Sequence, residues 1–598
     1  MNFHQLLSTA GLAAISCGVS AINAARPENP LATVAERTAY TRTGRYEEVE
    51  RLCRAYAAQW PQAVRCFEFG RTPEGRPMMA LVASRAPGLT PADASAHDLP
   101  VVLIQGGIHA GEIDGKDAGF LALREILENK IAPGVLERIA LVFVPVFNVD
   151  GHERFGRWNR PNQVGPEEMG WRVTAQNLNL NRDYMKAAAP EMEAMLRLLN
   201  AWDPILYVDL HVTDGAQFEY DVANLVEPFL GGDPALQPLG RALMDDTNAR
   251  VAAGGGLPLP FYFYPSLRDG NNPASGFAFD AYPPRFSTGY WALHNRFAML
   301  VETHSWKNYR TRVRVTHDIF VAVAELTARD GHAWLQAAHE SDQKARALGG
   351  TTVPLAFKTT DRHHMIDFRG YAYTREPSAA SGTLALRYDP KKPQIWHIPL
   401  YDEMVPSVEE SAPTGGYIVP AAHAAWLAER LALHGIESHL IEKDLGVKNV
   451  EEFRADKIEF STQPFEGRMM ATLSGKWTSE ERTISHGSLF VPIAQPKARL
   501  VMSLLEPRAP DSYASWGYFN AHFEQKEYME DYVTEEAAQE MLATRPEVVA
   551  EFDERLAKDP QFAKDRAARL EFFRRHHPSW DDRFNVYPVT RVARGVVD

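Results

Sequence analysis

Long apolar runs are missing from most of this 598-residue sequence. After the N-terminal residues, no stretch reaches the ~18 apolar residues of a membrane-spanning helix, so no transmembrane span is expected. An excess of basic residues is also missing, because 63 Lys and Arg stand against 77 Asp and Glu, a net charge of −14. Phosphate groups and anionic membrane surfaces are both bound by clustered basic side chains. We therefore expect neither nucleic acid nor a membrane surface as a partner.

Cysteine is scarce, with three residues in the whole chain. Cys17 falls within residues 1–24, an apolar stretch ending in small residues that resembles a signal peptide and predicts a secreted or periplasmic protein. This stretch lacks Lys and Arg, and a disordered apolar N-terminus or an imperfect lipobox at Cys17 are alternatives. Cleavage would leave Cys53 and Cys66, which either form a disulfide or remain two buried thiols.

The composition, 45% hydrophobic and 23% charged residues, is that of a soluble globular protein. The chain is too long for one core, so two or three domains are expected. In the first half, short apolar strands alternate with helices of ~10–15 residues, which is typical of an α/β fold. The expected strands lie at residues 64–69, 79–83, 101–105, 141–147, 205–210 and 297–301, and helices at 46–59 and 115–129.

Candidate metal ligands follow three of these strands. The spacing of His109 and Glu112 occurs six times as His-x-x-Asp/Glu, so spacing alone does not select this pair. Context does, because ligands of α/β proteins gather at the carboxyl ends of strands, where His109, Glu112, His211 and Glu302 all fall. The other pairs are better explained as solvated polar faces: His339/Asp342, His364/Asp367, His434/Glu437 and His439/Glu442.

Two histidines and one carboxylate, with one position left for water, make a hydrolytic zinc site. Zinc lowers the pKa of that water and polarises a carbonyl group, and a nearby carboxylate must then take the proton. Glu302 is the candidate for this role; alternatively it ends a strand and caps the next turn. Arg172 and Arg182 are suited to bind a carboxylate or an oxyanion, although two surface salt bridges would also explain them.

Six short motifs occur in a consistent order: GRTPEGRP, GGIHAGE, FNVDG, WR ahead of an NRD segment, a His after an apolar strand, and a strand carrying Glu. In this order the chain resembles the zinc metallocarboxypeptidase family, whose type members are the pancreatic carboxypeptidases, from residue 40 to residue 320. It is also similar to bacterial secreted members with a long C-terminal extension. The resemblance implies an α/β fold with a mixed twisted sheet and helices on both faces.

The resemblance also implies roles for individual residues. These are His109, Glu112 and His211 as ligands of one zinc ion, Glu302 as general base, Arg172 as carbonyl polariser, Asn181 and Arg182 on the substrate carboxylate, and Tyr290 over the substrate, with Tyr282 as its rival. Two positions depart from the family pattern, since Asn179 stands where Asp is frequent and Asp183 where Asn is common. An amide can hydrogen-bond an imidazole but does not raise its basicity as a carboxylate does.

The pattern of apolar and polar residues changes near residue 349, after which segments alternate as antiparallel strands do. We expect a signal peptide at 1–24, a catalytic domain at 25–348, and a β-rich α/β region at 349–598 that ends in helices. An aromatic-rich segment at 503–533 either packs on the catalytic domain and narrows access to its site, or belongs to a self-contained core.

The expected function is zinc-dependent hydrolysis of the C-terminal peptide bond, by a zinc-bound water with a Glu general base, in peptides or proteins with a free C-terminus. Two alternatives remain open. One is a related zinc amidohydrolase acting on cell-wall peptides or acyl-amino acids. The other is a catalytically silent binding scaffold, which would not need the proton-transferring Glu302.

Overall fold

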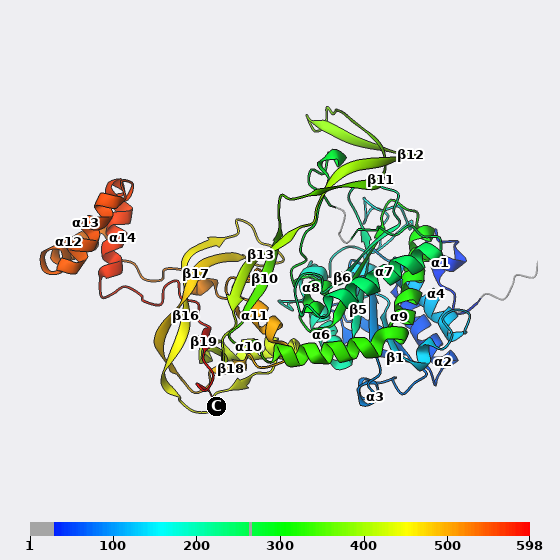
Figure 1. Ribbon diagram of the computed structural model, residues 1–598, viewed down its shortest axis with the longest axis horizontal. Helices are drawn as coiled ribbons and strands as arrows, with labels where there is room; N and C mark the ends of the chain where they lie inside the picture. The colour runs from blue at the N-terminus through cyan, green and yellow to red at the C-terminus, as the bar shows by residue number, and fades with distance from the viewer. Residues whose placement is uncertain (1–28, 262–265, 598) are drawn as a thin grey trace, which may run out of the picture.

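The computed structural model describes residues 29–261 and 266–597, which form an N-terminal α/β unit and a C-terminal region (Figure 1). The expected signal peptide, residues 1–24, lies outside the described residues. None of the helices in the described part of the chain combines the length and the apolar character that a membrane crossing requires.

A seven-stranded sheet forms the centre of the N-terminal unit, in the order β1-β2-β4-β3-β5-β9-β6. Its strands are β1 (Val64–Arg71), β2 (Pro77–Ala83), β3 (Val101–Gly106), β4 (Ala140–Val144), β5 (Leu206–Thr213), β6 (Val222–Glu227) and β9 (Phe297–His304). The four central strands run parallel, and the outer strands pair antiparallel. The sheet is therefore mixed, as the sequence predicted. Every residue of β3, β4 and β5 is buried, because helices cover both faces.

Alternating side chains of the strands contact helices on opposite faces of the sheet. On one face, Phe143 of β4 packs at 5.5 Å from Phe120 and at 5.4 Å from Phe320. On the other, Tyr207 of β5 packs at 6.2 Å from Trp291. The helices of the first face are α2 (Tyr46–Gln59), α4 (Asp114–Leu127), α7 (Gln237–Ala253) and α9 (Tyr309–Ala345), and those of the second are α6 (Pro190–Trp202) and α8 (Ser287–Ala292).

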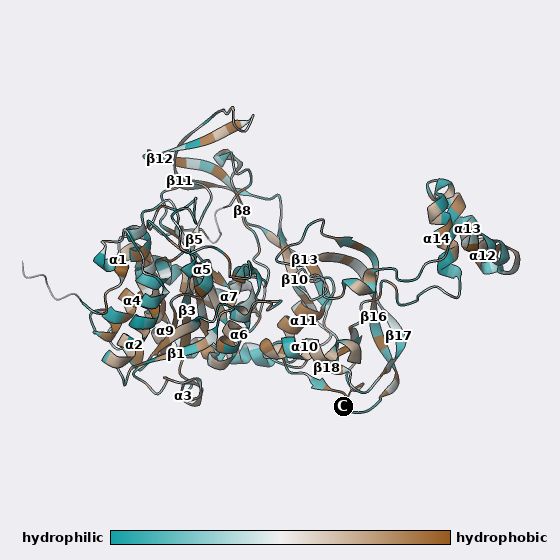
Figure 2. Cartoon of the chain, turned by 180° about the vertical axis from the view of Figure 1, so that it is seen from behind, coloured by the Kyte–Doolittle hydropathy of each residue, from teal (hydrophilic) through white to brown (hydrophobic). Residues whose placement is uncertain are grey.

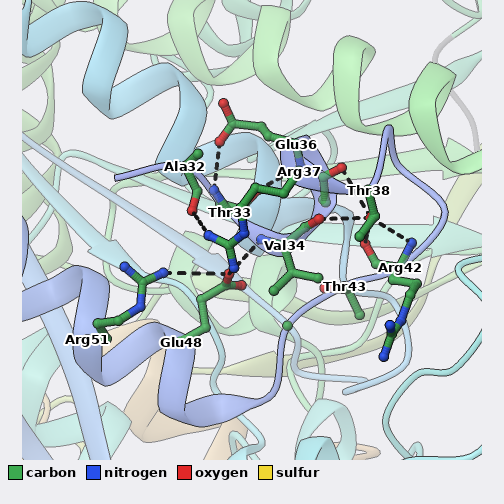
Figure 3. Close-up of polar contacts among 12 residues, drawn as sticks. Ala32, Thr33, Val34, Glu36, Arg37, Thr38, Arg42, Thr43, Glu48 and Arg51 are labelled. Carbon is green, nitrogen blue, oxygen red and sulfur yellow. Dashed lines mark hydrogen bonds and ion pairs between the residues drawn. The ribbon is translucent and has the colours of Figure 1, made fainter. Parts of the chain in front are cut away.

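The first described residues are fixed to the sheet-covering helices by a polar network (Figure 3). Thr33 and Glu36 form a capping box on the short helix α1 (Val34–Arg37). The Glu48 carboxylate of α2 accepts from the Val34 backbone N at 2.6 Å and pairs with the buried Lys116 ammonium of α4 at 2.7 Å. This contact connects α1, α2 and α4, and α4 begins two residues after Glu112.

The strands of the β-rich C-terminal region belong to three sheets. The strands β10 (Thr352–Thr359) and β13 (Met404–Ser411) form a pair, and β11 (His364–Pro377) with β12 (Leu384–Tyr401) forms a long hairpin that projects from the body (Figure 1). The hairpin continues into β8 (Phe277–Ala278) and β7 (Ser266–Leu267) of the N-terminal unit. A six-stranded sheet contains β14 (Gly416–Val419), β15 (His439–Leu440), β16 (Gly446–Phe460), β17 (Ala471–Ile484), β18 (Leu489–Pro492) and β19 (Thr590–Val592).

The last helices form a separate group, as Figure 2 shows. They are α12 (Asp531–Thr544), α13 (Pro546–Lys558) and α14 (Arg566–His576), and they pack around their own cluster of Phe552, Phe562, Phe572 and Phe573. After α14 the chain returns to add β19 to the six-stranded sheet. Helices α10 (Ala421–Leu433) and α11 (Ala498–Leu505) lie between that sheet and the N-terminal unit (Figure 1).

The structure decides between the two predicted states of the cysteines, because Cys53 of α2 and Cys66 of β1 form a disulfide. A bridge over a loop of this length restricts the unfolded chain and stabilises the fold by ~3 kcal/mol. We therefore expect the double variant Cys53→Ser/Cys66→Ser to lower the unfolding temperature by several degrees. Scanning calorimetry measures this change, and non-reducing peptide mapping must recover the two cysteines in one linked fragment; free thiols there would contradict the bridge.

Candidate active site

The strand register brings two of the predicted site residues together. In the parallel pair of β5 and β9, His211 lies directly opposite Glu302. Paired residues of neighbouring strands point to the same face of a sheet, so both side chains leave the sheet side by side near its carboxyl edge.

The loop after β3 brings His109 and Glu112 to the same edge. The chain turns sharply at Gly107, where φ is +64°, a left-handed conformation that glycine adopts without strain. Gly111 sits so close to the neighbouring loop that a Cβ there would lie 2.6 Å from Cγ of Arg160 and 2.7 Å from the carbonyl oxygen of Gly170. The glycines of the GGIHAGE motif therefore allow the turn and a close approach by the 155–170 loop.

The side chains of His109, Glu112 and His211 converge, and one ligand atom from each lies within 4.8 Å of the others. The Glu112 carboxylate lies between the two rings, with Oε1 3.0 Å from Nδ1 of His109 and Oε2 2.9 Å from Nδ1 of His211. All three side chains are at most 5% exposed. In the described part of the chain, no other set of three His, Cys, Asp or Glu side chains is arranged to hold a metal ion.

The second nitrogen of each imidazole has its own acceptor. Nε2 of His109 lies 3.2 Å from Oδ1 of Asn179, and Nε2 of His211 lies 2.8 Å from Oδ2 of Asp209. Asp209 is itself fixed by the Gln105 side-chain amide at 2.8 Å and by the Ser287 hydroxyl. Such partners hold an imidazole in one orientation, with its other nitrogen turned toward the metal position.

Burial and charge set different protonation states within the group. Burial lowers the pKa of His109 to about 4, so its imidazole is neutral. Burial also opposes the charge on His211, but the carboxylates of Asp209 and Glu112 outweigh it and raise its pKa well above the usual value. Burial disfavours the Glu112 carboxylate too, yet Arg160 and the imidazoles hold its pKa well below the usual value. A bound cation would displace the proton of His211.

The donor set fits zinc. Two imidazoles and one carboxylate are the protein ligands of a hydrolytic zinc site that keeps one position open. The three side chains are buried and lie close together, and the Nε2 atoms of both imidazoles are hydrogen-bonded. A cation there would therefore meet a preformed set of ligands.

A cavity of ~760 Å³ opens in front of the metal group. Besides the three candidate ligands, its walls contain Arg160, Arg172, Asn181, Arg182, Tyr282, Phe286 and Glu302. Residues 357–359 of β10 also line it, so the C-terminal region contributes to the walls of the site. The structure thus places seven of the eight predicted site residues around one cavity.

Glu302 lines this cavity and is partly exposed, whereas its Oε2 atom is buried and has no hydrogen-bond partner. Desolvation, with the carboxylates of Glu112 and Asp214 nearby, raises the pKa of Glu302 to about 8 even though His211 favours its ionised form. A carboxyl group at a cavity wall with a pKa near neutrality is suited to exchange a proton with a substrate or water.

Arg182 contributes a cation without a counterion. Its guanidinium lies 4.1 Å over the ring of Phe286 and donates to the carbonyl oxygen of Asn181 at 2.7 Å. Among the described residues no carboxylate lies within ion-pair distance of it. Burial, together with the charges of Arg172 and Arg285, lowers the pKa of Arg182 to about 10. A half-buried cation in this state attracts an anionic ligand, and Asn181, the preceding residue, lines the same cavity.

The motifs that carry no ligand hold the site loops in place. Thr72 and Arg76 of GRTPEGRP bind the Asp150 carboxylate of FNVDG, with 2.8 Å between Oγ1 of Thr72 and Oδ1. The Asn148 side chain of the same motif donates to the carbonyl oxygen of Arg172 at 3.2 Å. GRTPEGRP therefore holds FNVDG in place. FNVDG in turn holds the backbone at Arg172, whose side chain lines the cavity.

The structure corrects the prediction that Tyr290 lies over the substrate. It lies in α8, is fully buried, does not line the cavity, and its hydroxyl lies 2.9 Å from Nδ1 of His434. A tyrosine packed in this way does not cover a substrate, whereas its rival Tyr282 lines the cavity. The structure also corrects the prediction for His434, which is buried, with its pKa lowered by burial to about 3, whereas Glu437, His439 and Glu442 are exposed as predicted.

The sequence analysis did not identify two residues of the site, Arg160 and Asp209. Nη2 of Arg160 lies 2.7 Å from Oε1 of Glu112, closer than Nη1 of Arg172 at 3.7 Å. Arg160 belongs to an irregular loop without a motif, so no signal pointed to it. Asp209 did carry a signal, because it precedes His211 by two residues on a strand and therefore shares its face.

Comparison with known proteins matches part of the chain to one family. Residues 49–234 match the family model described as zinc carboxypeptidase. Rat carboxypeptidase Z is 28% identical over 149 residues, 23% of this chain and 21% of that protein. Carboxypeptidase 2 of Trichophyton tonsurans is 30% identical over 144 residues, 24% of this chain and 23% of that protein. The aligned stretch thus spans between a fifth and a quarter of the length of these relatives.

A solved structure also resembles the chain. Carboxypeptidase A from Helicoverpa armigera is 15% identical, covers 50% of this chain and 74% of its own, and superposes with a TM-score of 0.36. The family match contains all three candidate ligands, Arg172, Asn181 and Arg182, whereas Glu302 lies beyond it and rests on the strand register. Over residues 49–234 the chain is similar to the zinc carboxypeptidase family, which confirms the resemblance drawn from the motifs.

Proposed function

We propose that the chain is a zinc-dependent metallocarboxypeptidase that hydrolyses the C-terminal peptide bond of peptides or proteins with a free C-terminus. The observation that carries this proposal is the position of Arg182, a half-buried guanidinium without an ion-pair partner among the described residues, in the same cavity as the metal group and Glu302. A guanidinium binds a carboxylate through two parallel hydrogen bonds, so it recognises the end of a chain. The family match of residues 49–234 supports the same activity.

His109, Glu112 and His211 would hold one zinc ion. Zinc supplies Lewis-acid chemistry, which polarises the scissile carbonyl and activates water. Asn179 and Asp209 keep the two imidazoles oriented through their outer nitrogens. Arg160 keeps Glu112 ionised, because its guanidinium lies 2.7 Å from the carboxylate.

Arg182 and Asn181 bind the substrate carboxylate and thereby place the last peptide bond near the metal group. Glu302, which lines the cavity, takes a proton from the attacking water and passes it to the leaving amine. Arg172, which lines the same cavity, supports the negative charge that develops on the carbonyl oxygen. Tyr282, which also lines it, is the candidate to contact the substrate.

We also propose that the protein acts in an oxidising compartment, secreted or periplasmic. The support is the Cys53–Cys66 disulfide, since such bridges persist outside the reducing cytosol.

Asp209→Asn should weaken zinc binding by ~10- to 100-fold, because an amide orients the His211 imidazole without raising its basicity. Competition against a chromogenic chelator measures the zinc dissociation constant. The matched control is Asp203→Asn, which changes an aspartate that ends α6 and pairs with Arg296 away from the cavity. Equal zinc affinity in both variants would remove Asp209 from the support of the metal group.

Glu302→Gln should retain zinc and lose turnover by ~10²- to 10⁴-fold, because the amide cannot accept the proton. Metal analysis of the purified variant and steady-state hydrolysis of N-acyl dipeptides check the two parts separately. A variant with near-normal turnover would show that Glu302 is not the base.

Arg182→Ala should raise KM for substrates with a free C-terminal carboxylate by ~10- to 100-fold, the equivalent of one charge-assisted hydrogen bond or a bidentate pair. The assay compares N-acyl dipeptides with cell-wall peptides and acyl-amino acids. If KM for the dipeptides stayed unchanged, recognition of a chain end would be refuted and an amidohydrolase of other substrates would be favoured. If the zinc-loaded wild-type protein hydrolysed none of these substrates, a catalytically silent scaffold would be favoured.

A further inference from the structure

Residues 179–187, which carry Asn179, Asn181 and Arg182, contain little regular structure of their own. One 3-10 turn at Leu180–Arg182 is followed by further turns up to Pro190, where α6 begins. It has hydrogen bonds of its own, such as Arg182 N to Asn179 O and Ala187 N to Asp183 O, and contacts with residues outside it fix the rest of its conformation. The position of the proposed carboxylate site therefore depends on what surrounds this segment.

The C-terminal region supplies many of these contacts. Its hydrogen bonds to the segment run from Asn179 N to Glu466 Oε2 at 2.8 Å, from His434 Nε2 to Met185 O at 3.1 Å, from Tyr518 Oη to Lys186 O at 3.4 Å, and from Arg430 to Ala187 O. The Lys186 ammonium also lies 5.3 Å from the ring centre of Trp516. The predicted packing of the aromatic-rich segment against the N-terminal unit thus occurs through Trp516 and Tyr518.

Glu466 has the most direct connection to the site. It accepts from the backbone N of Asn179, and the Asn179 side-chain oxygen in turn contacts two site residues. That oxygen accepts from the Asn181 backbone N at 3.0 Å and lies 3.2 Å from Nε2 of His109. One carboxylate of the C-terminal region therefore fixes the residue that bridges a candidate metal ligand and the candidate carboxylate-binding pair.

The turn between β16 and β17 places Glu466 in this position. Glu466 has φ of +47° and the next residue, Gly467, has φ of +75°. Two consecutive left-handed residues suit a turn in which Asn and Gly are the usual choice, so glutamate there carries a cost in backbone conformation. The cost is offset where the side chain makes a required contact, and here that contact is the Asn179 backbone N.

The C-terminal region also holds the loop that carries Phe286, whose ring lies against Arg182. Asp511 accepts from the Arg285 backbone N at 3.0 Å and pairs with its guanidinium at 2.8 Å. The next residue, Phe286, carries the ring under Arg182. Phe465, which precedes Glu466, stacks at 5.9 Å on Trp516, and the Arg285 guanidinium lies over both rings. The turn that carries Glu466 is therefore itself braced against this loop.

We propose that Glu466 of the C-terminal region is a positioning residue for substrate recognition: through Asn179 it sets the place of Asn181 and Arg182. This inference rests on the proposed function, since it concerns the same carboxylate site. It assigns the C-terminal region a role in the reaction, because a residue more than 200 positions beyond the family match, which ends at residue 234, completes the site.

The test uses the full-length, zinc-loaded protein and three variants. Glu466→Ala removes the acceptor, and Glu466→Gln keeps a neutral oxygen acceptor at the same reach. The control is Glu459→Ala, which removes an exposed glutamate of β16 that pairs with Lys457 on its own strand. The measurements are KM and kcat on N-acyl dipeptides, the affinity for the amino acid released from the best of them, the zinc dissociation constant, and the unfolding temperature.

Glu466→Ala is expected to raise KM by ~10-fold, with a smaller fall in kcat, and to weaken binding of the released amino acid similarly. Its zinc dissociation constant should rise by ~3- to 10-fold, less than for a direct partner of a ligand. Glu466→Gln should stay within ~3-fold of wild type in all these values, and Glu459→Ala should match wild type.

Two results would overturn the role of Glu466. One is a Glu466→Ala variant that behaves like Glu459→Ala. The other is a fall in kcat at unchanged KM together with a lowered unfolding temperature, which indicates fewer folded molecules and not a displaced carboxylate site. If wild type and control hydrolyse no peptide, the proposed function fails instead. The zinc dissociation constants then still decide whether Glu466 positions Asn179.

Discussion

The pairing of β5 with β9 is the constraint on which the site depends. Because His211 lies opposite Glu302, a metal ligand and the candidate base share one face of the sheet without help from any loop. A shift of one residue in this register would turn one of the two side chains to the other face. Both strands are almost entirely buried between helices, so the apolar packing that stabilises the fold also fixes this register.

Charge in the cavity is arranged around this fixed pair. On the metal side, Glu112 lies between two imidazoles and beside Arg160, so its carboxylate stays ionised despite burial. On the other side of the cavity, Arg182 is half-buried and has no carboxylate within ion-pair distance among the residues that the structure describes. A cation and an anion are therefore attracted to neighbouring places in one cavity, and a substrate carboxylate at Arg182 brings its peptide bond toward the metal position. Recognition and chemistry are coupled by this separation of charge.

The sequence predicted the parts of the molecule that rest on periodic patterns. The buried strands, the helices at 46–59 and 115–129, and the proximity of the candidate ligands at the strand ends all follow from apolar runs and the residues after them. Asp209 could have been predicted, because it lies two residues before His211 on one strand and therefore points to the same face of the sheet. Arg160 was not, because a long irregular loop gives no periodicity from which to infer its direction.

Contacts between distant segments explain the two errors. Tyr290 is near the strand that carries Glu302 and matched a family motif only loosely, but its hydroxyl contacts His434, 144 residues later in the chain. His434 was read as solvated for the same reason, since its burial is created by the docking of α10 onto the N-terminal unit. The sequence of either segment alone contains no sign of the other.

The same reasoning applies to the boundary near residue 349. Composition and texture change there, and the long helix α9 ends just before it, so the sequence suggests two separable parts. The contacts argue otherwise, because β10 lines the cavity, Asp511 holds the loop with Phe286, and Glu466 holds Asn179. Regular elements of the N-terminal unit position the candidate metal ligands and Glu302. The irregular segment that carries Asn179, Asn181 and Arg182 is held by its own unit, through His109 and Phe286, and also by the C-terminal region, through Glu466.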